Sequence, residues 1–209
     1  MSGKRSLVLL AAVFLAACSS EPRQEAAPPA QQPAAAPKKK EIQQETGRRV
    51  FQNLYITARN WSADAQPVRL ESSSNSQARG LDGKAAIWRA RFASPGIRSA
   101  IKSFQWSGMP EDDGISPGTE DNFNPANAQT RPFDFAFLKS DSDNAFAEAQ
   151  KNGGAKYLQK AGDSGQVTYE LEWNARKNEL YWIVRYAGGP ARLTVLVNAS
   201  TGKFLRVLK

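Results

Sequence analysis

The chain has 209 residues and a formal net charge of +8, because 28 lysines and arginines outnumber 20 aspartates and glutamates. It contains no histidine and a single cysteine, which excludes Ser-His-Asp and Cys-His catalysis and metal or haem sites built on histidine or cysteine clusters. No nucleic-acid recognition motif accompanies the basic charge. We therefore expect no enzymatic activity, no cofactor, no metal and no nucleic-acid partner.

The first 17 residues have the three parts of a secretory signal. Lys4 and Arg5 form a positive start, residues 7–15 are apolar, and two alanines precede a cleavage point. The apolar stretch is much shorter than the roughly 20 residues that span a bilayer. A removable signal peptide is therefore predicted for residues 1–17.

The segment Leu15-Ala16-Ala17-Cys18 resembles the lipobox of bacterial lipoproteins. In that family the cysteine thiol carries diacylglycerol, the chain is cut in front of it, and the new amino group is acylated. The resemblance thus assigns Cys18 as the lipidation site and the bilayer as its partner, since several acyl chains on one residue hold a protein firmly in a leaflet. Ser19 stands where an aspartate would favour inner-membrane retention, so in a Gram-negative source the resemblance implies an outer-membrane anchor that faces the periplasm. An ordinary secretory signal with a coincidental cysteine is the alternative.

Residues 18–40 are rich in proline, alanine and glutamine and contain no aromatic residue or hydrophobic period. Such a segment buries too little apolar surface to offset the entropy of ordering, so a disordered tether is predicted. A coil of this length reaches roughly 25 Å, or roughly 70 Å in the extended polyproline form. The tether would hold a folded domain away from a membrane surface.

Residues 41–110 are predicted to form a helix followed by antiparallel strands. Apolar residues between positions 46 and 62 recur at helical spacing. Three later runs have strand character, namely 67–70, 86–92 and 98–107. We interpret this region as a first α+β unit.

Residues 140–209 show the same order more clearly. A helix that starts at residue 140 is expected to end at Gly153, where glycine permits a left-handed conformation. Alternating and continuous apolar runs then predict four strands, over 167–174, 180–186, 193–197 and 204–208. The short connections indicate an antiparallel meander, and we interpret the region as a second α+β unit.

The segment 111–139 between the two units is rich in glycine, proline, aspartate and asparagine and is predicted to be a loop. Its end, residues 133–138, alternates apolar with other residues and could form an extra strand or a strap between the units. Acidic residues in 111–124 could offer oxygen ligands to Ca²⁺, but their spacing does not match an EF-hand, and a solvated acidic loop is preferred.

The central strands of the two regions share a pattern. Trp88-x-x-Arg91 and Trp182-x-x-Arg185 are each followed by an aromatic residue, an alanine and a turn. An internal duplication explains this pattern, and a coincidence between two amphipathic strands is the alternative.

Residues 140–209 resemble a PepSY-type unit, in which one helix packs on a small antiparallel sheet. The features that carry the resemblance are the helix running into Gly153-Gly154, the aromatic strand 181–186 and the turn 198–203. Asn198 departs from the family, where an acidic residue is common at this place, and residues 43–107 look like a diverged copy. The implied fold class is α+β, a helix packed on an antiparallel sheet, as two PepSY- or cystatin-like α-β-β-β units in tandem.

The resemblance implies a non-enzymatic envelope lipoprotein that binds another envelope protein or a peptide, in protease regulation or envelope assembly. A sheet edge or the groove between the units would supply the contact surface. The alternative is a module that binds a small ligand or cell-wall fragment in a cavity between helix and sheet, lined by Trp88 or Trp182. A sheet packed solidly against its helices would argue against that alternative.

Overall fold

The computed structural model describes residues 41–189 and 191–208. The expected signal peptide 1–17, the tether 18–40 and the lipidation residue Cys18 lie outside the described residues. Within the described ranges, no helix is both long and apolar enough to cross a bilayer.

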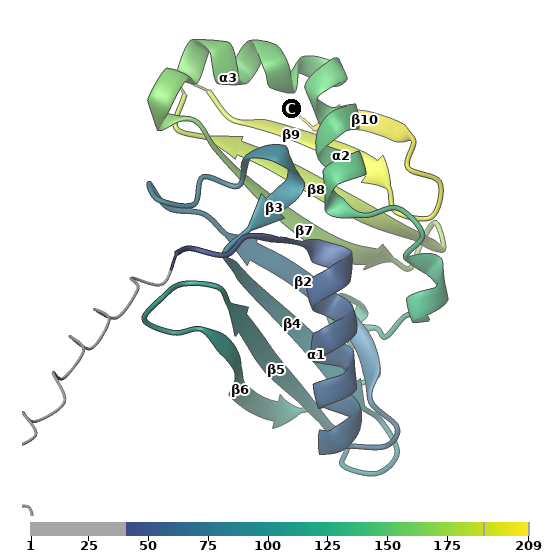
Figure 1. The fold of residues 1–209 in the computed structure, drawn as a ribbon. Coiled ribbons are helices and arrows are strands. Elements are labelled where there is room, and N and C mark those ends of the chain that lie inside the picture. The colour runs from purple at the N-terminus through teal and green to yellow at the C-terminus, as the bar shows by residue number, and fades with distance from the viewer. Residues whose placement is uncertain (1–40, 190, 209) are drawn as a thin grey trace, which may run out of the picture. The chain divides into compact units, whose positions relative to one another are not determined.

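Most described residues belong to one large antiparallel sheet and to helices on one of its faces (Figure 1), which confirms the predicted α+β class. The helices are α1 (Gly47–Trp61), α2 (Ser142–Ala149) and α3 (Ala155–Ala161). The strands of the large sheet are β2 (Gln66–Ser73), β4 (Ile87–Ser94), β5 (Ala100–Ser107), β6 (Gly114–Asn122), β7 (Gln166–Asn174), β8 (Glu179–Ala187), β9 (Leu193–Asn198) and β10 (Phe204–Leu208). Two short strands, β1 (Glu45–Thr46) and β3 (Lys84–Ala85), pair separately. All seven strands predicted from the sequence are confirmed, with shifts at their ends.

The large sheet has the strand order β10-β9-β8-β7-β2-β4-β5-β6, and all neighbours are antiparallel. Its first half, β2 to β6, runs outward from the centre in chain order. Its second half, β7 to β10, runs outward in chain order in the opposite direction. The halves join where β2 pairs with β7, in a register that places Glu71 opposite Glu170.

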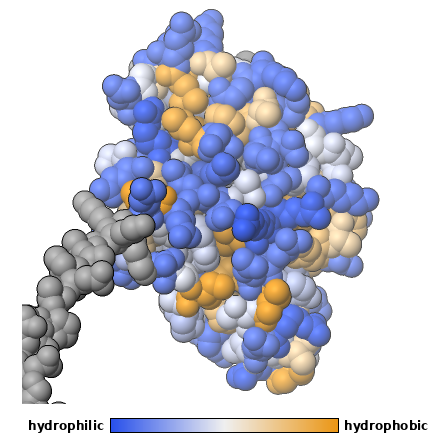
Figure 2. Space-filling model, viewed as in Figure 1, coloured by the Kyte–Doolittle hydropathy of each residue, from blue (hydrophilic) through white to orange (hydrophobic). Residues whose placement is uncertain are grey.

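A hydrophobic core lies between the helices and the sheet and contains residues of both halves. The helix predicted over 46–62 is confirmed as α1, and its buried residues follow the helical period: Val50, Phe51, Leu54 and Ala58. Figure 2, viewed from the same side as Figure 1, shows that the outer surface here is mostly hydrophilic with separate hydrophobic patches. The amphipathic helices therefore cover one face of the sheet and present polar residues to solvent.

Strand β6 lies inside the segment that the sequence predicts as a loop, so the loop prediction is wrong for residues 114–122. The strand pairs with β5 on one side only, and all its residues after Gly114 are exposed. Because neither face is buried, no alternation of apolar residues marks this strand in the sequence.

The helix predicted to end at Gly153 instead resumes after a break. Gly153 has φ of +110°, the left-handed conformation expected at a helix end, but a π turn over Gln150–Gly154 leads directly into α3. A Cβ at Gly154 would lie 2.2 Å from the Tyr186 hydroxyl oxygen. Glycine at this position therefore lets the broken helix pass close to the Tyr186 ring.

Residues 133–138 form a strap and not a strand. Phe133 is buried, with its ring 6.2 Å from that of Phe51 on α1 and 6.4 Å from that of Trp173 on β7. A 3-10 turn, Phe135–Phe137, follows. The strap thus packs on the helix of the first half and on a strand of the second.

Candidate functional site

Trp88 and Trp182, which the sequence suggests as the lining of a ligand cavity, lie inside the core. Neither side chain has exposed surface, and their ring centroids are 6.4 Å apart in an edge-to-face contact. Gly47 makes room for them, because a Cβ there would lie 2.6 Å from Trp182 Cη2 and 2.9 Å from Trp88 Cη2. Since no solvent-accessible space reaches either indole, the structure gives these tryptophans a packing role and offers no ligand surface at them.

Each indole also holds the chain just before a helix. Trp88 Nε1 donates a hydrogen bond to the carbonyl oxygen of Glu45 at 2.9 Å, two residues before α1. Trp182 Nε1 donates one to the carbonyl oxygen of Ser140 at 2.8 Å, two residues before α2. The same contact is therefore made once in each half of the sheet.

The face of the sheet opposite the helices, here called the open face, carries a network of charged side chains across its centre. Glu170 on β7 is only 4% exposed and forms ion pairs with Arg69 on β2 and Arg185 on β8. Glu71 on β2 lies 3.5 Å from Arg69 Nε and 4.0 Å from Arg89 Nη1. The network therefore links strands β4, β2, β7 and β8 on the side that no described helix covers.

Glu172 lies beside this network on the same face of β7. Burial raises the pKa of its carboxyl, and the neighbouring Glu170 raises it further, while Arg69 and Arg185 lower it. Because the folded chain favours the protonated form, the stability contribution of Glu172 is full below the ordinary pKa of glutamate. It is lost as the pH rises through the raised pKa.

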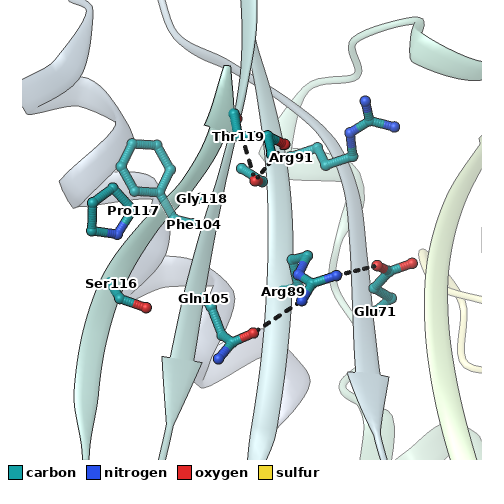
Figure 3. Close-up of a pocket in the computed structure, with 10 residues that line it drawn as sticks. Glu71, Arg89, Arg91, Phe104, Gln105, Ser116, Pro117, Gly118 and Thr119 are labelled. Atoms are coloured by element: carbon teal, nitrogen blue, oxygen red, sulfur yellow. Dashed lines mark hydrogen bonds and ion pairs between the residues drawn. The ribbon is translucent and has the colours of Figure 1, made fainter. Parts of the chain in front are cut away.

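A groove of about 400 Å³ opens beside the network, between β2 and the edge strand β6 (Figure 3). Most side chains that line it can form hydrogen bonds: Glu71, Arg89, Arg91, Ser103, Gln105, Ser116 and Thr119. Figure 3 shows Arg89 linked to Glu71 and to Gln105, whose Oε1 lies 3.2 Å from Arg89 Nη2. Gly118 brings β6 close to this wall, because a Cβ there would lie 2.3 Å from Ser103 Oγ.

Arg91 differs from the other charged residues of the groove. No hydrogen bond or ion pair joins its half-buried side chain to another described residue. Across the strands it lies opposite Arg69 on β2 and Ser103 on β5. Arg185 follows Trp182 as Arg91 follows Trp88, but Arg185 has a carboxylate partner in Glu170.

The edge strand β6 is protected against pairing with another chain. Pro117 has no amide hydrogen to donate, and Glu120 and Asp121 place charge on the strand. Glu120 accepts hydrogen bonds from Lys102 Nζ at 2.8 Å and Trp61 Nε1 at 3.2 Å, and the bond from Lys102 lowers the pKa of its carboxyl most. Proline and charge on an edge are known devices against strand addition.

The other edge strand, β10, lacks these devices. It has no proline, and Arg206 is its one charged residue. Its remaining side chains are large, apolar and 37–40% exposed: Phe204, Leu205, Val207 and Leu208. In Figure 1 the two edges lie at opposite sides of the sheet, β6 in teal and β10 in yellow.

The acidic residues of 111–124 do not converge. Residues 111–113 precede β6, whereas Glu120 and Asp121 lie near its far end, so most of an extended strand separates the two groups. Among the described residues there is no group of three or more carboxylate or cysteine side chains that could hold a metal ion. The preferred interpretation, a solvated acidic region, remains a prediction.

Neither the charged network nor the groove is predicted from the sequence. The alternation of Glu170 and Glu172 with apolar residues marks the open face of β7 and could have indicated half of the network. The pairing of β2 with β7 joins residues about a hundred positions apart, and no local pattern reports it.

Comparisons with known proteins identify no relative of this chain. No protein-family model matches the chain, and neither the search of curated proteins nor the search of solved structures gives a significant match.

Proposed function

We propose that this protein is a non-enzymatic envelope lipoprotein that binds an extended segment of another envelope protein as an added strand on β10. Acylated Cys18 would anchor it, in a Gram-negative cell to the outer membrane on the periplasmic side, and residues 18–40 would tether the domain. The observation that carries the proposal is the exposed apolar edge of β10.

A strand at the edge of a sheet leaves one row of backbone amides and carbonyls without a strand partner. An extended segment that pairs with this row gains main-chain hydrogen bonds, and its alternate side chains meet those of the edge strand. On β10 these are Phe204, Leu205, Val207 and Leu208, so the matching segment is an apolar one. Because β6 is protected and β10 is not, the two edges differ in the way a dedicated docking edge requires.

The PepSY-like interpretation belongs to the same proposal. Each half of the sheet runs outward in chain order, and each has a central-strand tryptophan bonded to the carbonyl two residues before a helix. These repeated features support two duplicated units, the first of which includes β6. The units would share one sheet and one core, so we assign the docking edge and not a groove between units as the contact surface.

Site-specific photo-crosslinking in the native host tests the docking edge. A photoreactive amino acid at Val207, which is 39% exposed, is expected to give a discrete adduct with one envelope protein. The same amino acid at Ile115 on β6, which is 42% exposed, is the matched control and is expected to give none. Leu205→Lys in the Val207 variant should weaken the adduct, because it places a charge on the apolar edge.

Two outcomes of this experiment contradict the proposal. One is the absence of any adduct at Val207 while the variant is folded and correctly located. The other is an equal set of adducts at Val207 and Ile115, which would indicate nonspecific collision with neighbours in the envelope.

Intact-mass measurement on protein purified from the native host tests the anchor separately. The expected mass corresponds to a chain that begins at Cys18 and carries acyl groups. A chain that begins at Met1 with a free thiol would refute the anchor and leave the docking edge to be judged by the crosslinks.

A further inference from the structure

We propose that the groove between β2 and β6 on the open face binds an oxyanion, a carboxylate or phosphate group of a small ligand, through the guanidinium of Arg91. The site lies at the opposite end of the sheet from β10 and does not depend on the docking edge. Four steps of charge and geometry support it.

The first step is the position of Arg91 among other cations. In the register of β2 with β4, Arg91 lies opposite Arg69, and Glu71 lies opposite Arg89. Like charges directly opposite on neighbouring strands are destabilising. A carboxylate within reach would relieve this, but Glu71 contacts Arg69 and Arg89, and Glu170 contacts Arg69 and Arg185.

The second step is the comparison with the other half of the sheet. In the register of β7 with β8, the residue opposite Arg185 is Thr168, which carries no charge. Arg185 also forms an ion pair with Glu170. The second half thus neutralises its arginine internally, whereas the first half leaves Arg91 without a described counter-charge.

The third step is the shape of the groove. A volume of about 400 Å³ is within the range of small-ligand sites. Gly118 lets the wall formed by β6 approach Ser103 closely, and Ser103 Oγ lies 3.4 Å from Thr119 Oγ1. Hydroxyl-bearing residues of β5 and β6 and Arg91 of β4 therefore line the same groove. In Figure 3 the Arg91 side chain extends toward β2, away from Thr119.

The fourth step is the chemistry of the guanidinium. Its planar set of N–H donors matches the two oxygens of a carboxylate or of a phosphate in a bidentate geometry. Gln105 accepts from Arg89 through Oε1, which leaves its amide nitrogen free to donate elsewhere in the groove. Arg89 is already bound to Glu71 and Gln105, so Arg91 supplies the guanidinium that is available to an anion.

Nuclear magnetic resonance titration of the full chain tests the site. The Nε–H signal of Arg91 is followed while inorganic phosphate, and separately acetate, is added at constant ionic strength with chloride. Arg59 is the internal control, because it is exposed on α1 and has no described partner. We expect saturable shifts at Arg91 with an affinity at least about tenfold tighter than any response at Arg59.

Variants complete the test. Arg91→Gln should remove the saturable shifts of backbone amides in β4 and β5, Arg91→Lys should weaken them because lysine lacks the bidentate fork, and Arg59→Gln should leave them unchanged. Saturation by phosphate alone or by acetate alone would identify which oxyanion the site takes. Parallel, unsaturable shifts at Arg91 and Arg59 with both anions would overturn the proposal, as would saturable shifts that persist in folded Arg91→Gln.

Discussion

Trp182→Ala is expected to lower the free energy of unfolding by about 3–5 kcal/mol, the range for removing a large aromatic side chain from a packed core. The indole has no exposed surface, and its loss leaves a cavity beside Trp88 and Gly47. It also leaves the Ser140 carbonyl oxygen without the hydrogen bond at 2.8 Å that holds the chain before α2. Denaturant unfolding followed by circular dichroism measures the change.

Two further variants separate the causes of this loss. Trp182→Phe keeps most of the ring volume but cannot donate to Ser140, so it should cost about 1–3 kcal/mol. Trp61→Ala removes a half-buried indole at the end of α1 and should cost about 1 kcal/mol. Equal losses for Trp182→Ala and Trp61→Ala would mean that the paired tryptophans do not form the centre of the core.

Glu170→Gln is expected to lower the free energy of unfolding by about 1.5–3 kcal/mol, since it removes a charged acceptor shared by two arginines. Glu170 is 4% exposed, but the side chains of Arg69 and Arg185 are 31% and 46% exposed. Water therefore still solvates both cations in the variant, and the loss stays below that of a fully buried pair. Thermal and denaturant unfolding at neutral pH measure it.

Glu170→Gln should also change how the free energy of unfolding depends on pH. Because the neighbouring Glu170 contributes to the raised pKa of Glu172, Glu170→Gln should bring the pKa of Glu172 closer to its ordinary value. The fall of stability with rising pH that Glu172 causes should then become smaller.

The matched control for the stability loss is Glu148→Gln, which breaks an exposed pair with Lys151 at 2.6 Å and should lower the free energy of unfolding by less than about 1 kcal/mol. A Glu170→Gln variant as stable as Glu148→Gln would show that the network contributes nothing to the fold.

Regular patterns in the sequence predict much of this fold. The helical period of α1 and the apolar runs of β7 to β9 each reflect a buried face, and they locate these elements to within a few residues. The apolar run of β10 also locates its strand, although its side chains are exposed. Strand β6 leaves no such pattern, because solvent surrounds it on both faces and its backbone pairing with β5 holds it. Helix α3 is hidden by Gly153-Gly154, which resembles a helix end but here permits a bend.

The residues of the candidate site are predicted less well from the sequence than the helices and strands are. Trp88 and Trp182 are conspicuous in the sequence because tryptophan is a rare residue type and both occur in the repeated Trp-x-x-Arg pattern. The structure buries both side chains in the core. Arg91 and Arg185 occupy the same place in the repeated pattern, yet only Arg185 has a carboxylate partner. That difference arises from the strand register, which places Arg69 in one half where Thr168 stands in the other, and a local pattern does not specify register between distant strands.

The asymmetry between the two edges also limits how copies of this molecule can associate. A sheet with two open edges can stack head to tail without end and grow into fibres. In the large sheet, Pro117 and the carboxylates of β6 protect one edge, so two copies that pair through this sheet would use their β10 strands, and neither copy would keep an unprotected edge. Self-association by strand pairing of the large sheet would therefore stop at a closed pair and would not grow into fibres.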